Sequence, residues 1–213
     1  MIRFFDITLS MLALLCLSPV LLLASLVLRS TGEGEIFYLQ VRVGKGKRRF
    51  RILKFATMLK DSPNLGARDL TVKGDPRILP LGKWLRATKL NEIPQLINVL
   101  RGDMSLIGPR PQTTGGLEGC SEKEIEILTR NRPGLSGIGS IVFRDEENML
   151  DGADSMDLYK KVITPYKVDL EEWFQRNRSI SLYFSLVFLT CWVVVFPRSG
   201  LIWKWFEALP EPP

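Results

Sequence analysis

Two apolar runs lie near the ends of the chain, and the sequence between them is mixed. Residues 7–28 contain no charged residue, and a helix of this length rises about 1.5 Å per residue, enough to cross a bilayer core. Residues 179–197 form a second uncharged run, rich in Leu, Phe and Val. The pattern predicts three parts: a membrane helix at 1–30, a mixed domain at 31–178, and an apolar helix with its tail at 179–213.

The first run is compatible with several arrangements. A cleaved signal peptide is disfavoured because the run is too long and no clear cleavage site of small residues follows it. Ser18 and Pro19 fall near its middle, where proline removes a backbone donor and kinks a helix. A serine hydroxyl can satisfy the freed carbonyl. A kinked spanning helix and a helix that bends back to the same face both remain open.

Charge next to the first run indicates its orientation. Positive flanks stay cytoplasmic and are attracted to anionic head groups. We therefore expect the mixed domain on the cytoplasmic face, although the same residues are also compatible with a lipid-facing surface. The basic residues are Lys45, Lys47, Arg48, Arg49, Arg51 and Lys54, with no acid among them.

The second run ends in an aromatic and basic segment. Trp192, Trp203 and Trp205, with Arg198 and Lys204, are typical of a membrane-interface anchor. We expect a helix in the plane of the membrane first, with a spanning helix and a buried core helix as alternatives.

Local patterns predict a small α+β domain in the middle. Residues rich in β-branched and aromatic side chains favour strands, and capping residues mark helices. The expected strands are 35–44 and 48–58, and the expected helices are 91–102 (closed by Gly102), 122–131 and 154–178 (interrupted near Pro165).

Composition narrows the chemistry. The formal net charge is +6 and the isoelectric point is about 9.3, so anionic partners are favoured. The sequence has no histidine, which excludes histidine-based triads and metal sites. Any metal would be a hard, oxygen-liganded ion such as Mg²⁺. Cys16, Cys120 and Cys191 form no close-spaced motif and are interpreted as packing residues.

The stretch KLNEIPQ, residues 89–95, has two interpretations. Asn91 is a good N-cap, Pro94 is tolerated in a first turn, and Glu92 suits the helix dipole, so the stretch reads as a helix start. A helix start also binds anions. Arg86, Lys89 and Arg110 lie nearby in sequence, and Glu92 and Asp103 are candidate Mg²⁺ ligands, so a phosphate-handling site is the alternative to the favoured helix start.

Several ordered motifs resemble one family. Residues 75–112 resemble the core of the bacterial sugar transferases, the monotopic phosphoglycosyl transferases that start glycan assembly on a polyprenyl phosphate. The resemblance covers almost the whole chain. It also includes the Ser18-Pro19 break, LKFATM (53–58), GDMSLIGPRP (102–111) and RPGLSG (132–137).

The resemblance implies an activity and a location. Members of this family transfer a sugar 1-phosphate from a UDP-sugar to polyprenyl (undecaprenyl) phosphate and release UMP, with Mg²⁺ required. This is the first step of bacterial glycan or exopolysaccharide synthesis. The Ser-Pro break implies a re-entrant helix that enters one leaflet of the inner membrane from the cytoplasmic side. The sugar, the final glycan and any homo-oligomer stay open.

The site residues are carried over by motif. Arg86, Arg110, Lys54 and Arg132 match substrate-binding positions, although Lys54 and Arg132 also admit structural roles. Glu92 matches the family's Mg²⁺-binding glutamate.

Asn91 stands where the family has a nucleophilic aspartate, and a neutral amide is a poor nucleophile. Three active routes remain open: direct attack by the lipid phosphate, a covalent role for Glu92, or an acid from 145–147. Solvent exposure is the alternative for that acidic stretch.

Two rival functions also follow. An inactive relative would bind a nucleotide sugar within an assembly complex. A basic membrane-surface protein would bind nucleic acid or anionic lipid, but no nucleic-acid motif is present, so we expect no nucleic-acid partner.

Overall fold

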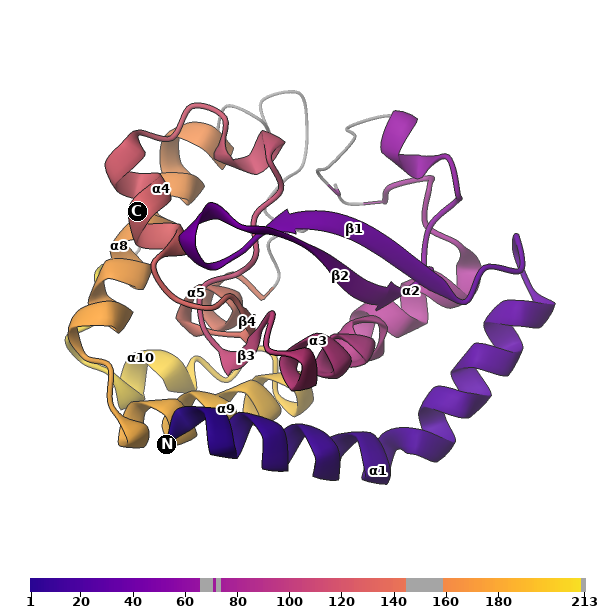
Figure 1. Cartoon of the computed structure of the whole chain (residues 1–213), viewed down its shortest axis with the longest axis horizontal. Coiled ribbons are helices and arrows are strands. Elements are labelled where there is room, and N and C mark those ends of the chain that lie inside the picture. Colours follow the sequence, from indigo (N-terminus) through magenta and orange to yellow (C-terminus); the bar gives the residue numbers. More distant parts are fainter. Residues whose placement is uncertain (66–70, 72–73, 145–158, 212–213) are drawn as a thin grey trace.

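The computed structural model describes residues 1–65, 71, 74–144 and 159–211, and the fold consists of short elements set above a long helix (Figure 1). The strands are β1 (Phe37–Val43), β2 (Arg49–Phe55), β3 (Ser105–Ile107) and β4 (Gly134–Ser136). The α-helices are α1 (Ile2–Ser30), α2 (Pro80–Ala87), α3 (Leu96–Arg101), α4 (Glu122–Thr129), α5 (Ile138–Val142), α8 (Thr164–Arg176), α9 (Ile180–Val195) and α10 (Leu201–Trp205). Tighter 3₁₀ turns are η1 (Lys45–Lys47), η2 (Ser62–Asn64), η3 (Leu90–Gln95) and η4 (Gly115–Leu117), whereas η5 (Tyr159–Ile163) is a wider π-helical turn.

The sheet content is small and mixed in direction. β1 and β2 form an antiparallel hairpin in which Phe37 pairs with Phe55 and Val43 with Arg49. β3 and β4 form a separate parallel pair. The two strands expected from composition are confirmed. The domain was expected to be α+β, and the structure shows a mixture of α-helices and short strands, with a long apolar helix at the N-terminus and a shorter one near the C-terminus.

The helix α1 contains Pro19 and changes direction along its length (Figure 1). Proline has no N–H to donate to the carbonyl of Leu15, and the hydroxyl of Ser18 donates to that carbonyl instead, at 2.8 Å. The expected role of serine at the break is therefore confirmed.

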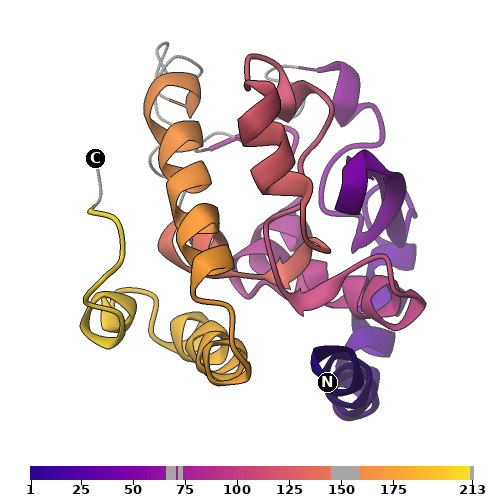
Figure 2. The same ribbon diagram turned by 60° about the vertical axis from the view of Figure 1, so that its left-hand side comes forward.

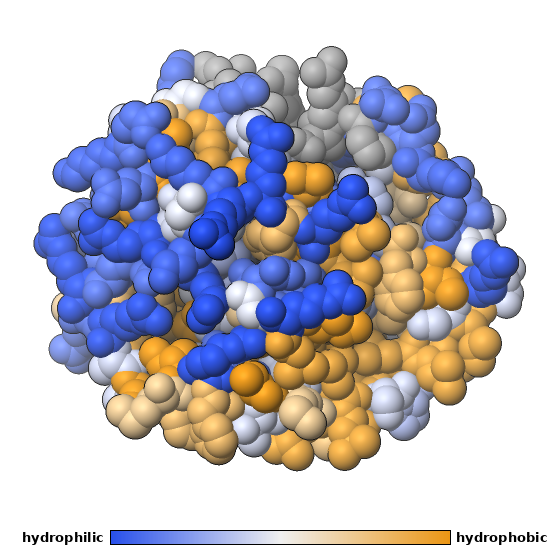
Figure 3. Space-filling model, in the orientation of Figure 1, coloured by the Kyte–Doolittle hydropathy of each residue, from blue (hydrophilic) through white to orange (hydrophobic). Residues whose placement is uncertain are grey.

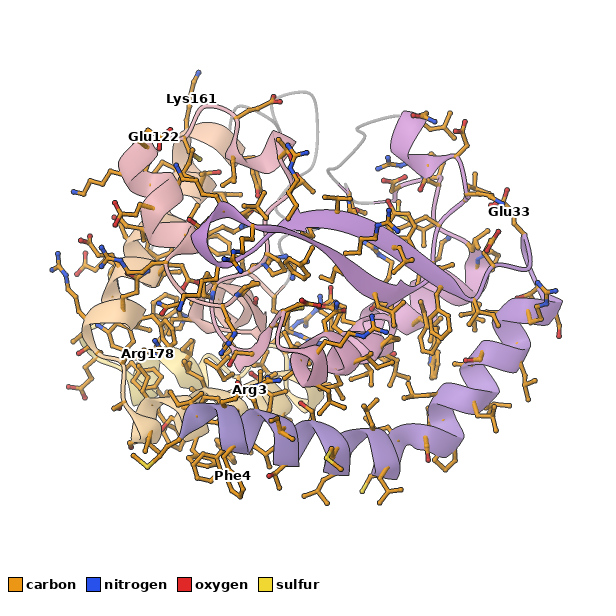
Figure 4. The ribbon with its side chains drawn as sticks, in the orientation of Figure 1. Arg3, Phe4, Glu33, Glu122, Lys161 and Arg178 are labelled. Atoms are coloured by element: carbon orange, nitrogen blue, oxygen red, sulfur yellow. The ribbon has the colours of Figure 1, made fainter. Side chains whose placement is uncertain are left out.

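An apolar face forms the base of the molecule. The first half of α1 lies beside α9, and both helices lie with α10 along the lower edge of Figure 1; the same edge of the space-filling view is mostly apolar (Figure 3). Phe4 points down from α1, whereas Arg3 points up into the domain (Figure 4). The most exposed apolar residues of α1 are Phe4, Met11, Leu12, Leu15, Leu22, Leu23 and Leu26. Such an extended apolar surface is typical of a membrane contact.

Polar contacts fasten the first turns of α1 to the domain. The buried carboxylate of Asp6 accepts hydrogen bonds from the Ser105 hydroxyl at 2.8 Å, the Leu106 amide at 2.9 Å and the Tyr183 hydroxyl at 2.9 Å. The guanidinium of Arg3 donates to the carbonyl of Leu100 at 2.8 Å, at the carboxyl end of α3. The helix α1 is therefore fastened to α3, β3 and α9.

The helix α9 packs one face on the domain and leaves the other exposed. Leu182, Leu186 and Leu189 are buried in the largest core cluster, while Phe188 on the opposite face is 47% exposed. With 16 residues, α9 is shorter than the span a bilayer core needs. Figure 2 shows α9 and α10 on the same side of the molecule as the start of α1.

The basic hairpin turn lies away from this base. η1 connects β1 to β2 beside α4, where Lys47 forms an ion pair with Glu122 at 2.6 Å (Figure 1). Lys47 thus forms its ion pair with the domain itself, on a side of the molecule away from the apolar base.

We predict that Asp6→Ala lowers the free energy of unfolding by about 3 kcal/mol, because it leaves buried donors of Ser105, Leu106 and Tyr183 without an acceptor. Denaturation in nanodiscs, followed by tryptophan fluorescence, measures this loss. Asp61→Ala, at an exposed acid, is the matched control. Equal stability of the two variants would contradict the fastening role of Asp6.

Candidate functional site

The KLNEIPQ stretch folds as a tight turn rather than as the start of an α-helix. Lys89 adopts a left-handed conformation with φ of 59°, and η3 then carries the chain to Gln95 before α3 begins. The expected N-cap role of Asn91 is wrong, since Asn91 lies inside η3 and caps nothing. Pro94 supplies no N–H, which disfavours a regular α-helical turn here. The expected end at Gly102 is confirmed by its φ of 92°.

A left-handed conformation at a non-glycine residue costs on the order of 1 kcal/mol. At Lys89 this strain directs the next residues into one cavity, because Lys89, Asn91 and Glu92 all line it. Strain of this kind is concentrated at functional sites.

Glu92 forms the centre of a charged cluster. Its carboxylate Oε1 lies 2.9 Å from the Lys54 ammonium and 3.6 Å from the Arg110 guanidinium, and the side chains of Glu92 and Lys54 are each 16% exposed. Burial alone would raise the pKa of Glu92, but Lys54 and Arg110 together hold that pKa well below its ordinary value. Glu92 is therefore an ionised carboxylate at neutral pH.

Lys54 has a perturbed acidity as well. Burial lowers the pKa of Lys54 to about 8; Glu92 opposes this change, and the positive charges of Arg110 and Arg42 add to it. The ammonium is therefore held by its contact with Glu92 and loses its proton at mildly alkaline pH.

The side chain of Asn91 is only 6% exposed, and its Oδ1 has no hydrogen-bond partner. A buried polar atom without a partner is costly unless a ligand supplies one. Asn91 lines the same cavity as Glu92. The amide oxygen is therefore positioned to receive a donor or a cation from a bound molecule.

The cavity has a volume of about 1030 Å³, large enough for a nucleotide sugar. Several of its cationic residues come from separate parts of the chain: Arg42 from β1, Lys54 from β2, Arg86 from α2, Lys89 from the turn after α2, and Arg110 from the loop after β3. This arrangement fits a ligand that carries several negative charges.

The parallel pair β3–β4 positions Arg110. The Ser105 amide donates to Pro133 and the Gly108 amide to Ser136, so the GPRP segment crosses RPGLSG at close range. A side chain on Gly108 would place its Cβ 2.4 Å from the Arg132 carbonyl oxygen, so only glycine fits. The two glycine-containing motifs thus hold the backbone that presents Arg110.

Two of the residues predicted to belong to the site, Arg132 and Asp103, do not line the cavity. Arg132 is exposed and does not line the cavity, although its backbone contributes to the crossing just described. Asp103 accepts a hydrogen bond from Asn98 at 3.3 Å and also lies outside the cavity, so pairing it with Glu92 as a metal ligand is wrong. The acidic residues 145–147 lie outside the described residues.

Sequence reasoning missed Lys167. This residue lines the cavity from α8 and is only 8% exposed. A signal was present, because Lys167 lies on the same helix face as the buried Ile163, Leu170 and Phe174, where a lysine is out of place.

The described residues do not enclose a metal ion by themselves. No group of three or more acidic, histidine or cysteine side chains forms within the ranges that the structure covers. Mg²⁺ commonly binds through one or two carboxylates together with substrate phosphates. Glu92 and the unpartnered Oδ1 of Asn91 fit this mode, so the residues present are compatible with a Mg²⁺ ion that arrives with a diphosphate.

Comparison with known proteins places the chain in a family. The family model described as bacterial sugar transferase matches residues 1–197. The chain belongs to this family. An undecaprenyl-phosphate glucose phosphotransferase of Komagataeibacter xylinus is 37% identical over 93% of this chain and 36% of its own length.

Two further members of the bacterial sugar transferase family are similar along much of the chain. An exopolysaccharide production protein, ExoY, of Sinorhizobium fredii is 36% identical, covering 68% of this chain and 70% of its own length. A UDP-glucose:undecaprenyl-phosphate glucose-1-phosphate transferase of Caulobacter vibrioides is 34% identical, covering 80% and 62%. The chain spans only about two-fifths of the length of three curated relatives, the Komagataeibacter xylinus protein among them, at 36%, 42% and 41%.

We predict that pyrophosphate binds less tightly as the pH rises through about 8, because Lys54 then loses the proton that attracts the anion. Below that pH the ammonium is present and binding is stronger. Titration calorimetry from pH 7 to 9.5 measures the change.

Lys54→Arg is the control for this titration, since arginine stays charged over the whole range while pyrophosphate itself titrates identically. The account requires a smaller loss of affinity in Lys54→Arg than in the unmodified protein. Parallel curves for the two proteins would contradict it.

Proposed function

We propose that this protein is a phosphoglycosyl transferase that moves a sugar 1-phosphate from a UDP-sugar to a polyprenyl phosphate and releases UMP. One observation carries the proposal: a cationic cavity around the ionised Glu92 reaches the end of an exposed apolar helix. The activities printed for the relatives from Komagataeibacter and Caulobacter support it.

The cavity suits one soluble and one lipid-borne substrate. Leu28, in the last turns of α1, lines it together with Phe37 and Leu79, so its apolar side adjoins the membrane helix. A lipid phosphate would enter from this side, with its chain following α1. The nucleotide sugar would approach from solvent, and both reactants would meet at one interface.

Catalysis would depend on charge compensation. Lys54, Arg86 and Arg110 would bind phosphate oxygens, and they would stabilise the charge on the leaving UMP. Glu92 would hold Lys54 and Arg110 in place and contribute a carboxylate oxygen to Mg²⁺. When bound, Mg²⁺ would offset diphosphate charge.

The absence of an aspartate at position 91 favours a direct transfer. An oxygen of the lipid phosphate would attack the sugar-bearing phosphorus of the donor, and the bond to the bridging oxygen would break as UMP leaves with the electron pair. Glu92 is poorly suited as the nucleophile because Lys54 and Arg110 already neutralise its carboxylate. Asn91 would orient a donor oxygen or the metal through its unpartnered Oδ1.

The neutral side chain of Asn91 supports a second candidate function, the binding of a nucleotide sugar without catalysis. Because Asn91 carries no charge, the protein would serve equally as a nucleotide-sugar-binding relative within a glycan assembly complex. Such a protein would bind the donor and release no UMP.

UMP release separates these functions. The full-length protein in nanodiscs with polyprenyl phosphate, Mg²⁺ and a panel of UDP-sugars is expected to release UMP with at least one sugar. Glu92→Gln is expected to lower the rate about a hundredfold or more, because the charges that position the diphosphate lose their partner.

Asn91→Asp is the informative companion variant. Activity in the unmodified protein that depends on lipid and on Glu92 supports the transferase. If the unmodified protein releases no UMP and Asn91→Asp does, the transferase proposal is overturned. The result would instead favour a protein that binds a nucleotide sugar without transferring it.

We further propose that α1 enters and leaves the membrane on one face, at the cytoplasmic side of a bacterial inner membrane. The proline break, the serine contact to Leu15 and the polar fastening of Arg3 and Asp6 to the domain support this topology. α9 and α10 would lie in the same interface.

We predict that an N-terminal epitope tag and a cysteine introduced by Arg178→Cys lie on the same side of the membrane, because α1 returns to the face it entered. Protease digestion of the tag and impermeant thiol labelling, in intact and in inverted vesicles, measure the two positions. The native cysteines are replaced by serine in the tagged protein and in the Arg178→Cys protein, so that only the introduced cysteine is labelled. Opposite accessibility would show that α1 spans the bilayer.

A further inference from the structure

The strand β1 has one edge that pairs with β2 and one edge that is largely free. The two strands pair from Phe37 with Phe55 to Val43 with Arg49. Within the described residues, the backbone of the free edge is bonded at its far end, where the Val43 amide donates to the Gln112 carbonyl at 2.8 Å. A free edge of this kind presents backbone donors and acceptors that can bind a partner.

Hydrogen bonds between α3 and β2 show which residues of β1 point outward. The side chain of Asn98 in α3 accepts from the Leu53 amide at 3.0 Å and donates to the Arg51 carbonyl at 2.8 Å. These backbone groups point away from β1, and in an antiparallel ladder the residues opposite them point away from β2. The residues opposite are Leu39 and Val41. The amides and carbonyls of Leu39 and Val41 therefore lie on the free edge.

Of these two residues, only Leu39 lines the cationic cavity. Its neighbour Tyr38 pairs with Lys54 of β2, whose ammonium contacts Glu92. Adjacent strands lie about 4.8 Å apart, so the free edge at Leu39 lies beside the charged cluster. In Figure 1 this edge is on the upper side of the hairpin, away from α3 and the apolar base. The position suits the soluble substrate better than the lipid.

The backbone groups of one strand residue select the chemistry of a ligand. Leu39 offers one donor and one acceptor that point the same way. An ionised phosphate presents acceptors alone, and a polyprenyl chain presents neither. The uracil ring of a UDP-sugar presents a donor, N3–H, between two carbonyl acceptors, so one side of the ring matches both backbone groups at once.

We propose that the free edge of β1 at Leu39 binds the uracil base of the donor. The Leu39 amide donates to a ring carbonyl, and the Leu39 carbonyl accepts from N3–H. The inference rests on the proposed function. In this arrangement the diphosphate extends from the base towards Lys54, Glu92 and Arg110. The strand edge selects the base, and the charged cluster binds the phosphates whatever the base is.

Proline substitution tests the backbone contact directly. Leu39→Pro deletes an amide hydrogen that the β1–β2 ladder does not use, and proline is tolerated on strand edges at such positions. Val41→Pro makes the same change two residues along the same edge, outside the cavity lining, and is the matched control. Titration calorimetry of the full-length protein in nanodiscs measures the affinity for UMP and for pyrophosphate, which carries no base.

Leu39→Pro is expected to weaken UMP binding about fivefold, the loss of one hydrogen bond, and to leave pyrophosphate binding unchanged. Val41→Pro should bind both ligands like the unmodified protein. A change in the ligand tests the second contact: N3-methyl-UMP lacks the N3–H donor, so the unmodified protein should bind it about tenfold more weakly than UMP.

Three results would overturn the inference: equal UMP affinity in Leu39→Pro and the unmodified protein, an equal loss of UMP affinity in Val41→Pro, or equal binding of UMP and N3-methyl-UMP. A parallel loss of pyrophosphate affinity in Leu39→Pro would also overturn it, because the damage would then not concern the base. If the unmodified protein neither binds UMP nor releases it from any UDP-sugar, the proposed function fails. If it releases UMP but binds N3-methyl-UMP equally well, only this inference fails.

Discussion

The ion pair between Glu92 and Lys54 is the contact around which the site is organised. It joins η3 to β2 in a partly buried position, and Arg110 approaches the same carboxylate from the loop after β3. Three separate segments of the chain are thus fixed by one acid. Without Glu92, the neighbouring cations would repel each other, and the cavity would lose its arrangement for a diphosphate.

The membrane helix belongs to this arrangement and is more than an anchor. Asp6 holds the beginning of β3, which leads to Arg110, and Arg3 holds the end of α3, which follows Glu92. The apolar base and the anion cavity are therefore built from contiguous elements. In the proposed topology, this arrangement would hold a charged site close to a lipid surface without exposing its own polar groups to lipid.

The sequence allowed some of these features to be predicted and concealed others for physical reasons. Composition revealed the two strands β1 and β2, and Gly102 marked the end of α3, because both are local signals. The contacts of Asp6 could not be predicted, since they join residues separated by 99 to 177 positions. Asn91 reads as a helix cap in isolation, but Pro94 and the left-handed Lys89 impose a tighter turn.

The candidate site was predicted best where charge and motif coincided, at Lys54, Arg86, Glu92 and Arg110, all of which line one cavity. Arg132 lay in a recognisable motif, yet the role of that motif in the structure is carried by backbone atoms. Lys167 lay in no recognised motif, and only its place on a buried helix face pointed to it.

The most direct test of the account is a structure of the full-length protein in nanodiscs with Mg²⁺ and a non-transferable phosphonate analogue of the UDP-sugar it accepts. The account predicts that the diphosphate lies within hydrogen-bonding distance of Lys54 and Arg110, with the metal beside Glu92. A diphosphate bound elsewhere, with the Glu92–Lys54 pair untouched, would contradict it.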